Sequence, residues 1–294
     1  MSRVVHFIVN ARIGAKKTAA LTRALLMHFA DVPHRVLSTE YGGHALVLAR
    51  EAVEQEATAV AAVGGDGTVN EVLQALAGKG IPMGIVPTGS GNGLARHAGI
   101  PLDIEQAVAL VRHGEPHTID LGLANERYFI SNAGAGFDAW VCRQIRDSKL
   151  RGLPMYVRHV AFRFFRYKPL RFRITADGQT FEETAWFANV ANGREFGYGF
   201  TISPKASLDD GSLDLVLVRD INVLKGLRFV MDGWRGTLDR NTNCLHLRGK
   251  DFTISSEGLD TFQTDGDAHD CQGSCHIRIV PSALPLIMPK PPQP

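Results

Sequence analysis

Three short turns in this 294-residue sequence place aspartates next to glycines, and these carboxylates are the residues best suited to chemistry. The first turn is Gly64–Thr68, with Asp66 at its centre, and the others lie at 207–212 and 264–267. A turn that offers one carboxylate and neighbouring carbonyl oxygens suits a hard cation such as Mg²⁺. Aspartate and glycine also favour turns for conformational reasons alone, so the two later turns have a simple structural interpretation as well.

The turn around Asp66 has the features of a phosphate-binding loop. It follows the apolar run 59–63, which predicts a buried strand, and it precedes an expected helix over Val69–Ala77. Thr68 and Glu71 have the spacing of a capping box, so the helix should begin at Thr68. Free N–H groups at a helix N-terminus attract phosphate, whereas Asp66 repels it unless a cation intervenes. The pattern therefore indicates phosphate with a metal, or alternatively an ordinary capped turn between strand and helix.

The elements that must position this turn alternate between strand and helix. The expected strands are short apolar runs bounded by turn residues, at 4–10, 34–38, 58–63 and 82–86. This alternation predicts an N-terminal α/β domain with a doubly wound parallel sheet, in which ligands bind at the carboxyl ends of the strands. The loops at that edge share glycine, hydroxyl or amide groups and lie at 10–17, 39–44, 64–68 and 88–93.

The second half of the chain has a different pattern. Short strand-like runs and a strong hairpin turn at Asp177-Gly178 predict a mainly antiparallel C-terminal β domain, either a sandwich or a distorted barrel. A helix over about 223–234 interrupts these strands. We therefore expect an α/β domain at 1–118, a β domain at 119–280, and a proline-rich tail or strap at 281–294.

Composition excludes several classes of protein. A net charge of +2 argues against a dedicated nucleic-acid-binding protein. Because no run of about 18 apolar residues occurs, we expect no membrane-spanning helix. The cysteines are few and scattered, as in a reduced cytosolic protein. Cys271 and Cys275 lack a second pair of ligands at zinc-binding spacing, so we expect no metal there.

An ordered set of segments resembles the catalytic motifs of the diacylglycerol kinase and sphingosine kinase superfamily. These segments are 64–72, 87–92, 137–139, 189–193 and 204–211, and Asp265-Gly266-Asp267 stands where the family has Asp-Gly-Glu. The resemblance covers about residues 4–280. It implies an ATP- and Mg²⁺-dependent kinase that phosphorylates the hydroxyl of a diacylglycerol-like or long-chain-base lipid. The Gly-Ser-Gly-Asn run at 89–92 is more similar to the sphingosine and ceramide kinase branch, so the lipid stays open.

The resemblance also implies roles for individual residues. Asp267 matches the family's proton acceptor, and Asp265 beside it is a metal-binding or orienting carboxylate, or the base itself. Asp66 would support phosphate and metal binding. A structural Mg²⁺ is implied at the oxygens of three residues: Ser207, Asp210 and Ser212. The implied nucleotide contacts are Asn10, Thr39, Gly64, Gly65, Asp66, Gly67, Thr68, Val69, Asn70, Glu71, Thr88, Gly89, Ser90 and Asn92.

The expected partner is a lipid at a membrane surface. The basic and aromatic stretch Arg151–Arg173 suits peripheral contact with anionic headgroups, although a solvated basic face over core aromatic residues has the same pattern. We expect a cytoplasmic protein, peripheral at the inner membrane face, and a homodimer is compatible with the sequence. Two other functions stay open. One is a soluble-substrate kinase, because NAD kinases share Gly-Gly-Asp-Gly-Thr, and the other is a non-catalytic nucleotide- or lipid-binding protein.

Overall fold

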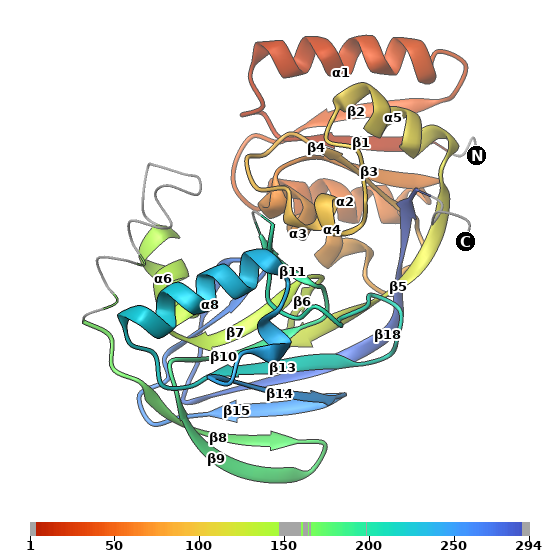
Figure 1. Ribbon diagram of the computed structural model, residues 1–294. Coiled ribbons are helices and arrows are strands. Elements are labelled where there is room, and N and C mark those ends of the chain that lie inside the picture. Colours follow the sequence, from red (N-terminus) through yellow and green to blue (C-terminus); the bar gives the residue numbers. More distant parts are fainter. Residues whose placement is uncertain (1–3, 147–159, 161–163, 165, 198, 290–294) are drawn as a thin grey trace. The chain divides into compact units, whose positions relative to one another are not determined.

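The computed structural model describes residues 4–146, 160, 164, 166–197 and 199–289 (Figure 1). The chain forms two compact units. Unit 1 comprises residues 1–119 together with 281–294, and unit 2 comprises residues 120–280. The expected fold class, a parallel-sheet α/β domain followed by an antiparallel β-sandwich, is confirmed.

Unit 1 is built on a parallel sheet with the strand order β2-β1-β3-β4. Its strands are β1 (Val5–Val9), β2 (His34–Ser38), β3 (Ala59–Gly64) and β4 (Met83–Pro87). The last residues of β18 (Ser274–Met288) join this sheet, where Leu286 pairs with Met83 of β4. Strands β1, β3 and β4 are buried along their whole length, as the continuous apolar runs of the sequence predict.

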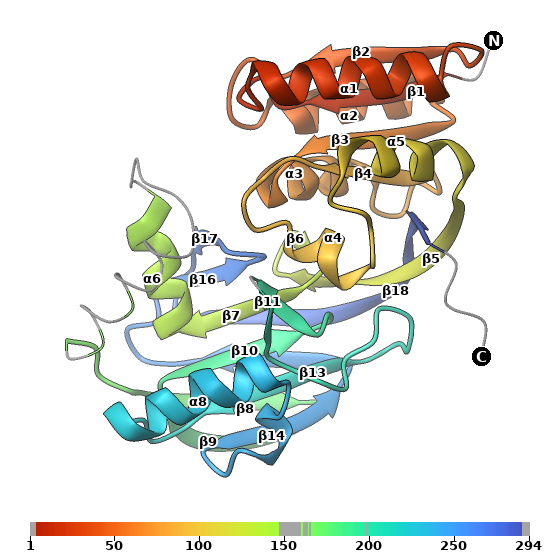
Figure 2. The same cartoon turned by 45° about the horizontal axis from the view of Figure 1, so that its top comes forward.

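Helices cover both faces of this sheet (Figures 1 and 2). They are α1 (Ala15–His28), α2 (His44–Glu54), α3 (Asp66–Leu76), α4 (Gly93–His97) and α5 (Ile104–His113). Helices α1 and α5 pack together on one face, where Phe7, Leu25 and Val108 belong to one buried cluster. Helices α2 and α3 pack against each other and against β1 and β3.

Unit 2 is a sandwich of two antiparallel sheets. One sheet has the order β14-β13-β10-β7-β16-β17, and the other contains β18-β15-β8-β9 with β5 and β6 beside β18. The first sheet consists of β7 (Asn132–Gly136), β10 (Phe187–Ala191), β13 (Leu213–Val218), β14 (Cys244–Gly249), β16 (Thr261–Thr264) and β17 (Asp267–Asp270). The second adds β5 (Glu115–Ala124), β6 (Arg127–Phe129), β8 (Leu170–Ala176), β9 (Gln179–Ala185) and β15 (Asp251–Ser255). Buried side chains from both sheets, including Val190, Leu215 and Phe252, form the core of the sandwich.

Unit 2 also contains a tight hairpin, a small two-stranded ribbon and several helices. The hairpin at Asp177-Gly178 joins β8 to β9, and both residues have positive φ, as a type I′ turn requires. A small ribbon pairs β11 (Glu195–Gly197) with β12 (Phe200–Thr201). Among the described residues, unit 2 also contains the helices α6 (Phe137–Arg146) and α8 (Val223–Arg235) and the short 3₁₀ helix η1 (Leu238–Arg240). Helix α8 lies where the sequence predicts one.

The C-terminal and basic segments differ from simple sequence expectations. The proline-rich end, expected as a tail or a strap, continues β18 as far as Met288, because Leu284, Leu286 and Ile287 are buried in unit 1. Most of the basic and aromatic stretch Arg151–Arg173 lies outside the described residues, and residues 170–173 belong to β8. The proposed membrane contact through that stretch therefore stays a prediction.

Candidate functional site

The loops that follow β1, β2, β3 and β4 meet at one edge of the sheet of unit 1. The Asn10 side-chain amide donates to the hydroxyl of Thr68 at 2.9 Å, and the N–H of Ala11 donates to the hydroxyl of Thr39 at 3.3 Å. The N–H of Thr88 donates to the carbonyl of Gly64 at 2.8 Å. The structure thus brings together residues of all four predicted nucleotide-binding loops.

The glycine turns after β3 and β4 touch backbone to backbone. A Cβ atom on Gly89 would lie 2.6 Å from the Cα of Gly65, and one on Gly65 would lie 3.2 Å from the Cα of Gly89. Gly64 has no room either, because a Cβ there would lie 2.5 Å from the Thr68 side chain. These glycines are required by close packing, and they leave the N–H groups of two turns at the same edge.

Two details at this edge indicate a place for an anion. The hydroxyl of Thr88 is buried and has no hydrogen-bond partner among the described residues. Lys17, which was not among the predicted contacts, donates from Nζ to the carbonyl of Thr88 and adds a positive charge. Its position in the first turns of α1, after a strand, is the only sequence signal that marks it. The N-terminus of α3 adds the partial charge of a helix end.

The predicted capping box of α3 is wrong. Helix α3 begins at Asp66, two residues earlier than expected, after Gly65 in extended conformation and without a side-chain cap. The Thr68 hydroxyl instead accepts from Asn10, and the Glu71 carboxylate accepts from the N–H groups of Gly43 and Ala45, each at 3.0 Å. Glu71 therefore caps the neighbouring helix α2, which has no cap residue of its own.

Asp66 lies in the first turn of α3 rather than in a free loop. One carboxylate oxygen accepts from the N–H of Gly93 at 2.8 Å, so Asp66 fixes the start of α4. Burial raises the pKa of this carboxyl above its usual value, although backbone N–H groups around Gly93 act in the opposite direction. The raised pKa reflects the cost of holding this negative charge away from water.

The other predicted nucleotide contacts divide into two groups. Asn92 closes the turn after β4, accepting from the N–H of Gly89 at 3.0 Å and donating to its carbonyl at 3.1 Å, while Ser90 in that turn is exposed. Val69 is buried, and Asn70 accepts from Gln74 on α3 at 3.1 Å. The buried Val69 can therefore contribute only its backbone, the contact predicted for Asn70 stays a prediction, and the glycines and hydroxyl residues form the loop edge.

In unit 2 the turn at 264–267 contains two carboxylates with different surroundings. The Asp265 carboxylate accepts from three consecutive backbone N–H groups, those of Ile130 at 3.0 Å, Ser131 at 2.8 Å and Asn132 at 3.2 Å. Asp265 therefore holds the loop between β6 and β7. Asp267 begins β17 and is exposed. Of the two candidate bases, Asp267 has the more accessible carboxylate.

A buried polar cluster lies beneath this turn. The Asn132 side-chain oxygen accepts from the amides of Asn189 at 3.0 Å and Gln263 at 2.7 Å, and the Gln263 oxygen accepts from the N–H of Gly266 at 2.9 Å. Asp138 completes the cluster, with the same two amides 3.3 to 3.4 Å from its carboxylate. Burial raises the pKa of Asp138 to about 6. In the sequence, Asp138 stands out only as part of the segment 137–139, because nothing in its neighbouring residues shows that it is buried.

The acidic loop at 207–212 is anchored at Asp120, a buried residue that the sequence analysis did not identify. Its carboxylate accepts from the N–H of Gly211 at 2.7 Å. Asp210, the predicted Mg²⁺ ligand, pairs with the guanidinium of Arg248 through one oxygen and accepts from the N–H of Ser212 at 3.1 Å through the other. Both oxygens are therefore occupied by protein donors. A cation at Asp210 would compete with Arg248 for this carboxylate, and the Mg²⁺ site implied at Ser207, Asp210 and Ser212 stays a prediction.

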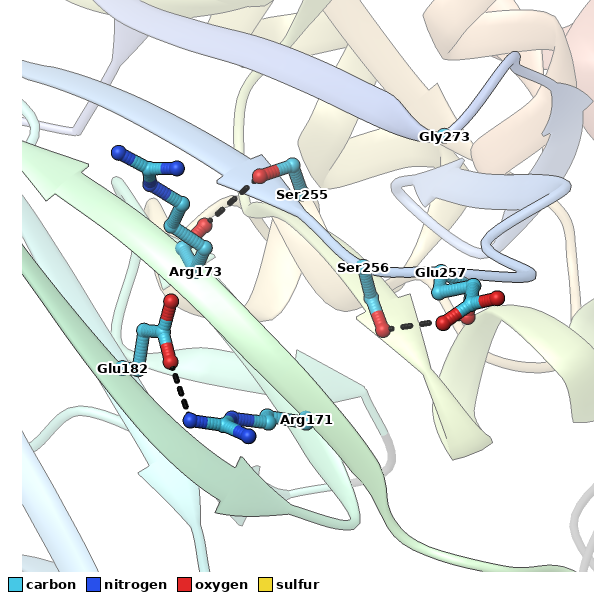
Figure 3. A pocket seen from close by; sticks show the side chains of 7 residues that line it. All are labelled: Arg171, Arg173, Glu182, Ser255, Ser256, Glu257 and Gly273. Carbon is cyan, nitrogen blue, oxygen red and sulfur yellow. Dashed lines mark hydrogen bonds and ion pairs between the residues drawn. The ribbon is translucent and has the colours of Figure 1, made fainter.

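The rest of the described structure offers weaker candidates for a functional site. No group of three or more His, Cys, Asp or Glu side chains within the described ranges is arranged to hold a metal. A hollow of about 480 Å³ on unit 2 contains none of the predicted site residues (Figure 3). It is lined by Arg171, Arg173, Glu182, Ser255, Ser256, Glu257 and Gly273. Arg171 and Glu182 pair across it at 2.7 Å, so its charges largely compensate one another. Among the described helices, none is long and apolar enough to cross a bilayer.

Comparison with known proteins gives consistent matches over both units. Residues 4–124 match the diacylglycerol kinase catalytic domain, and residues 131–288 match the YegS C-terminal NAD kinase beta sandwich-like domain. The chain is 33% identical over 249 residues to the diacylglycerol kinase of Mycobacterium tuberculosis, covering 81% of this chain and 79% of that protein. It is 31% identical over 266 residues to a protein of Cronobacter sakazakii named "Probable lipid kinase YegS-like", covering 87% of each.

Solved structures agree in fold. The crystal structure of a diacylglycerol kinase from Bacillus anthracis superimposes with a TM-score of 0.80. The superposition covers 98% of each chain, at 22% sequence identity. This likeness concerns the fold alone.

Proposed function

Because this chain belongs to the family of diacylglycerol kinase and YegS-like lipid kinases, we propose that it phosphorylates the hydroxyl of a diacylglycerol-like or long-chain-base lipid with ATP. In this reaction the lipid oxygen forms a bond to the γ-phosphorus, and the bond from that phosphorus to the bridging oxygen of ADP breaks. The hydroxyl proton passes to a carboxylate. The products are ADP and a lipid phosphate monoester.

The observation that carries the proposal is the strand edge of unit 1. There the backbones of Gly65 and Gly89 touch, the N-terminus of α3 begins, and Lys17 adds a positive charge. The buried hydroxyl of Thr88 lacks a partner among the described residues. Backbone N–H groups, a helix end, a cation and an unpaired hydroxyl are the groups that bind phosphate oxygens. We propose that this edge binds the phosphates of ATP.

For the proton acceptor we propose Asp267. Phosphoryl transfer needs mainly positioning and charge neutralisation, together with one base that receives the proton of the attacking alcohol. Asp265 accepts from three backbone N–H groups, which favour its ionised form and hold its carboxylate in place. Asp267 is exposed at the start of β17, two residues away, and the hold on Asp265 fixes the turn that presents it.

ATP is proposed to bind together with Mg²⁺, which would neutralise developing charge on the phosphates. Asp66 is the carboxylate in unit 1 that we propose for this cation, because it lies in the first turn of α3, at the proposed phosphate-binding edge. The same carboxylate also accepts from the N–H of Gly93 at 2.8 Å, which fixes its position at the start of α4. No part of the proposed reaction depends on a cation at Asp210.

The test is transfer of radiolabelled phosphate from ATP to a panel of diacylglycerols, monoacylglycerols, sphingoid bases and NAD. We expect lipid products, and an Asp267→Asn variant with kcat lower by about 10²- to 10⁴-fold and unchanged ATP affinity. Asp270→Asn is the matched control, because Asp270 is an exposed aspartate on the same strand. Labelling of NAD alone, or full activity in Asp267→Asn, would overturn the proposal.

A further inference from the structure

Helix α8 displays a continuous apolar stripe on its exposed side. Of the eleven large apolar side chains exposed among the described residues, five belong to this one helix. Their exposed fractions are Val223 50%, Leu224 78%, Leu227 59%, Met231 47% and Trp234 55%. Residues three and four positions apart lie on the same side of a helix, so these five form one face. Such clustering differs from the scattered apolar residues of an ordinary surface.

The opposite side of α8 already holds the helix in place. Phe229 packs against Phe187 and Phe200, with ring centroids 5.9 and 5.5 Å apart. Gly233 is buried, and a Cβ there would lie 2.2 Å from the Phe200 ring. The Asn222 side chain caps the N-terminus, and Gly236 ends the helix with positive φ. The fold therefore does not need the exposed stripe, which is available for a partner.

The charges around the stripe favour an anionic partner. Residues 219–240 contain five basic and three acidic residues. At 100° per residue, Arg228 and Arg235 lie along one edge of the stripe, and both are exposed. Asp232 is already paired with Arg228 at 3.5 Å, whereas Arg235 has no ion-pair partner among the described residues.

We propose that α8 docks unit 2 on the surface of an anionic phospholipid bilayer. The helix would lie in the interface plane, with the apolar stripe among the acyl chains and the arginines at the phosphates. A convex stripe on a single helix suits a fluid bilayer, which needs no complementary groove, and Trp234 suits the headgroup boundary. The choice of a bilayer over a protein rests on the proposed function, because a lipid substrate would come from such a surface.

The first test is sedimentation of the full chain with vesicles of equal parts phosphatidylcholine and phosphatidylglycerol, without ATP. We expect the affinity of a double variant, Leu224→Glu with Leu227→Glu, for these vesicles to fall by about tenfold or more. Arg228→Gln and Arg235→Gln should each weaken binding about fivefold at low salt. The matched control is Leu26→Glu with Met27→Glu on α1, where the side chains are 70% and 57% exposed. Equal loss in both double variants, or loss in neither, would overturn the proposal.

The second test locates the contact at one residue. Quenching of tryptophan fluorescence by brominated lipids should be largely lost in Trp234→Phe, while the other two tryptophans remain. Unchanged quenching in this variant would overturn the proposal. Both tests measure binding without phosphoryl transfer, so they separate this inference from the kinase. Vesicle binding without kinase activity would support the docking surface and contradict the proposed function. Kinase activity on dispersed short-chain lipid without vesicle binding would support the proposed function and overturn the docking surface.

Discussion

The turn around Asp66 in unit 1 and the turn around Asp265 and Asp267 in unit 2 look alike in sequence, since each places aspartate beside glycine. In both, one carboxylate binds backbone N–H groups of a distant loop, at Gly93 for Asp66 and at residues 130–132 for Asp265. Only the turn in unit 2 has a second, exposed carboxylate, that of Asp267. Bonds to backbone N–H groups thus mark Asp66 and Asp265 as residues that hold loops, whereas the exposed Asp267 is the proposed proton acceptor.

The largest effect on stability is expected at Asp265. Asp265→Ala leaves three N–H groups without their acceptor and should lower the free energy of unfolding by about 3 kcal/mol. Urea denaturation measures this, with Asp270→Ala as the control, because Asp270 is exposed and its ion pair with Arg143 spans 3.7 Å. If the two variants are equally stable, Asp265 does not hold the loop and the comparison fails.

Asp138 tests a different case, a fully buried carboxylate that accepts from the N–H of Ala139 at 2.7 Å and from two side-chain amides at 3.3 to 3.4 Å. Its pKa rises from 3.8 to about 6 because burial disfavours the charge. A raised pKa in the folded state contributes stability that is fully present below about pH 4 and is lost as the pH rises through about 6. We expect this group to lower the free energy of unfolding by about 2 to 3 kcal/mol between those limits.

The measurement is urea denaturation from pH 4 to pH 7 for the wild type and Asp138→Asn. The difference in free energy of unfolding between the two proteins should change across this window and become constant above it. A difference independent of pH would mean that Asp138 keeps its ordinary pKa despite burial.

Glu71 extends the comparison to a helix end. Glu71→Ala removes the acceptor for the N–H groups of Gly43 and Ala45, so we expect a loss of about 1 to 2 kcal/mol in the free energy of unfolding. Thermal denaturation measures it, and Glu54→Ala, at an exposed position on α2, serves as the control. A variant as stable as that control would show that water replaces the cap without cost.

The smallest effect is expected at Arg248, whose ion pair with Asp210 is partly exposed. Arg248→Gln should change the free energy of unfolding by about 0 to 1 kcal/mol without metal. It should also create a response to Mg²⁺ that the wild type lacks, because the Asp210 carboxylate then loses its competing cation. Thermal denaturation with and without Mg²⁺ measures both. Equal stabilisation of both proteins by Mg²⁺ would show that Arg248 does not compete with the cation and would support the predicted metal site.

Sequence patterns were sufficient for the architecture and for the membership of the loop edge. Alternating strands and helices predict the parallel sheet, and Asp177-Gly178 predicts a hairpin, because both depend on neighbouring residues. Partners across long separations could not be predicted. Thr68 and Glu71 have capping-box spacing, yet Glu71 caps α2 instead, at Gly43, 28 residues away. Likewise, the N–H groups that donate to the Asp265 carboxylate belong to residues more than 130 positions earlier.

The course of β18 has a consequence for the order of synthesis. Unit 2 is contiguous in sequence, so all of it is synthesised before the segment that completes unit 1. Unit 1 receives its last strand only afterwards, when Leu286 pairs with Met83 and the carbonyl of Ala283 accepts from the N–H of Gly78 at 2.8 Å. Until then, the edge of β4 that later meets β18 lies open to any other extended chain. The domain made first is therefore completed last.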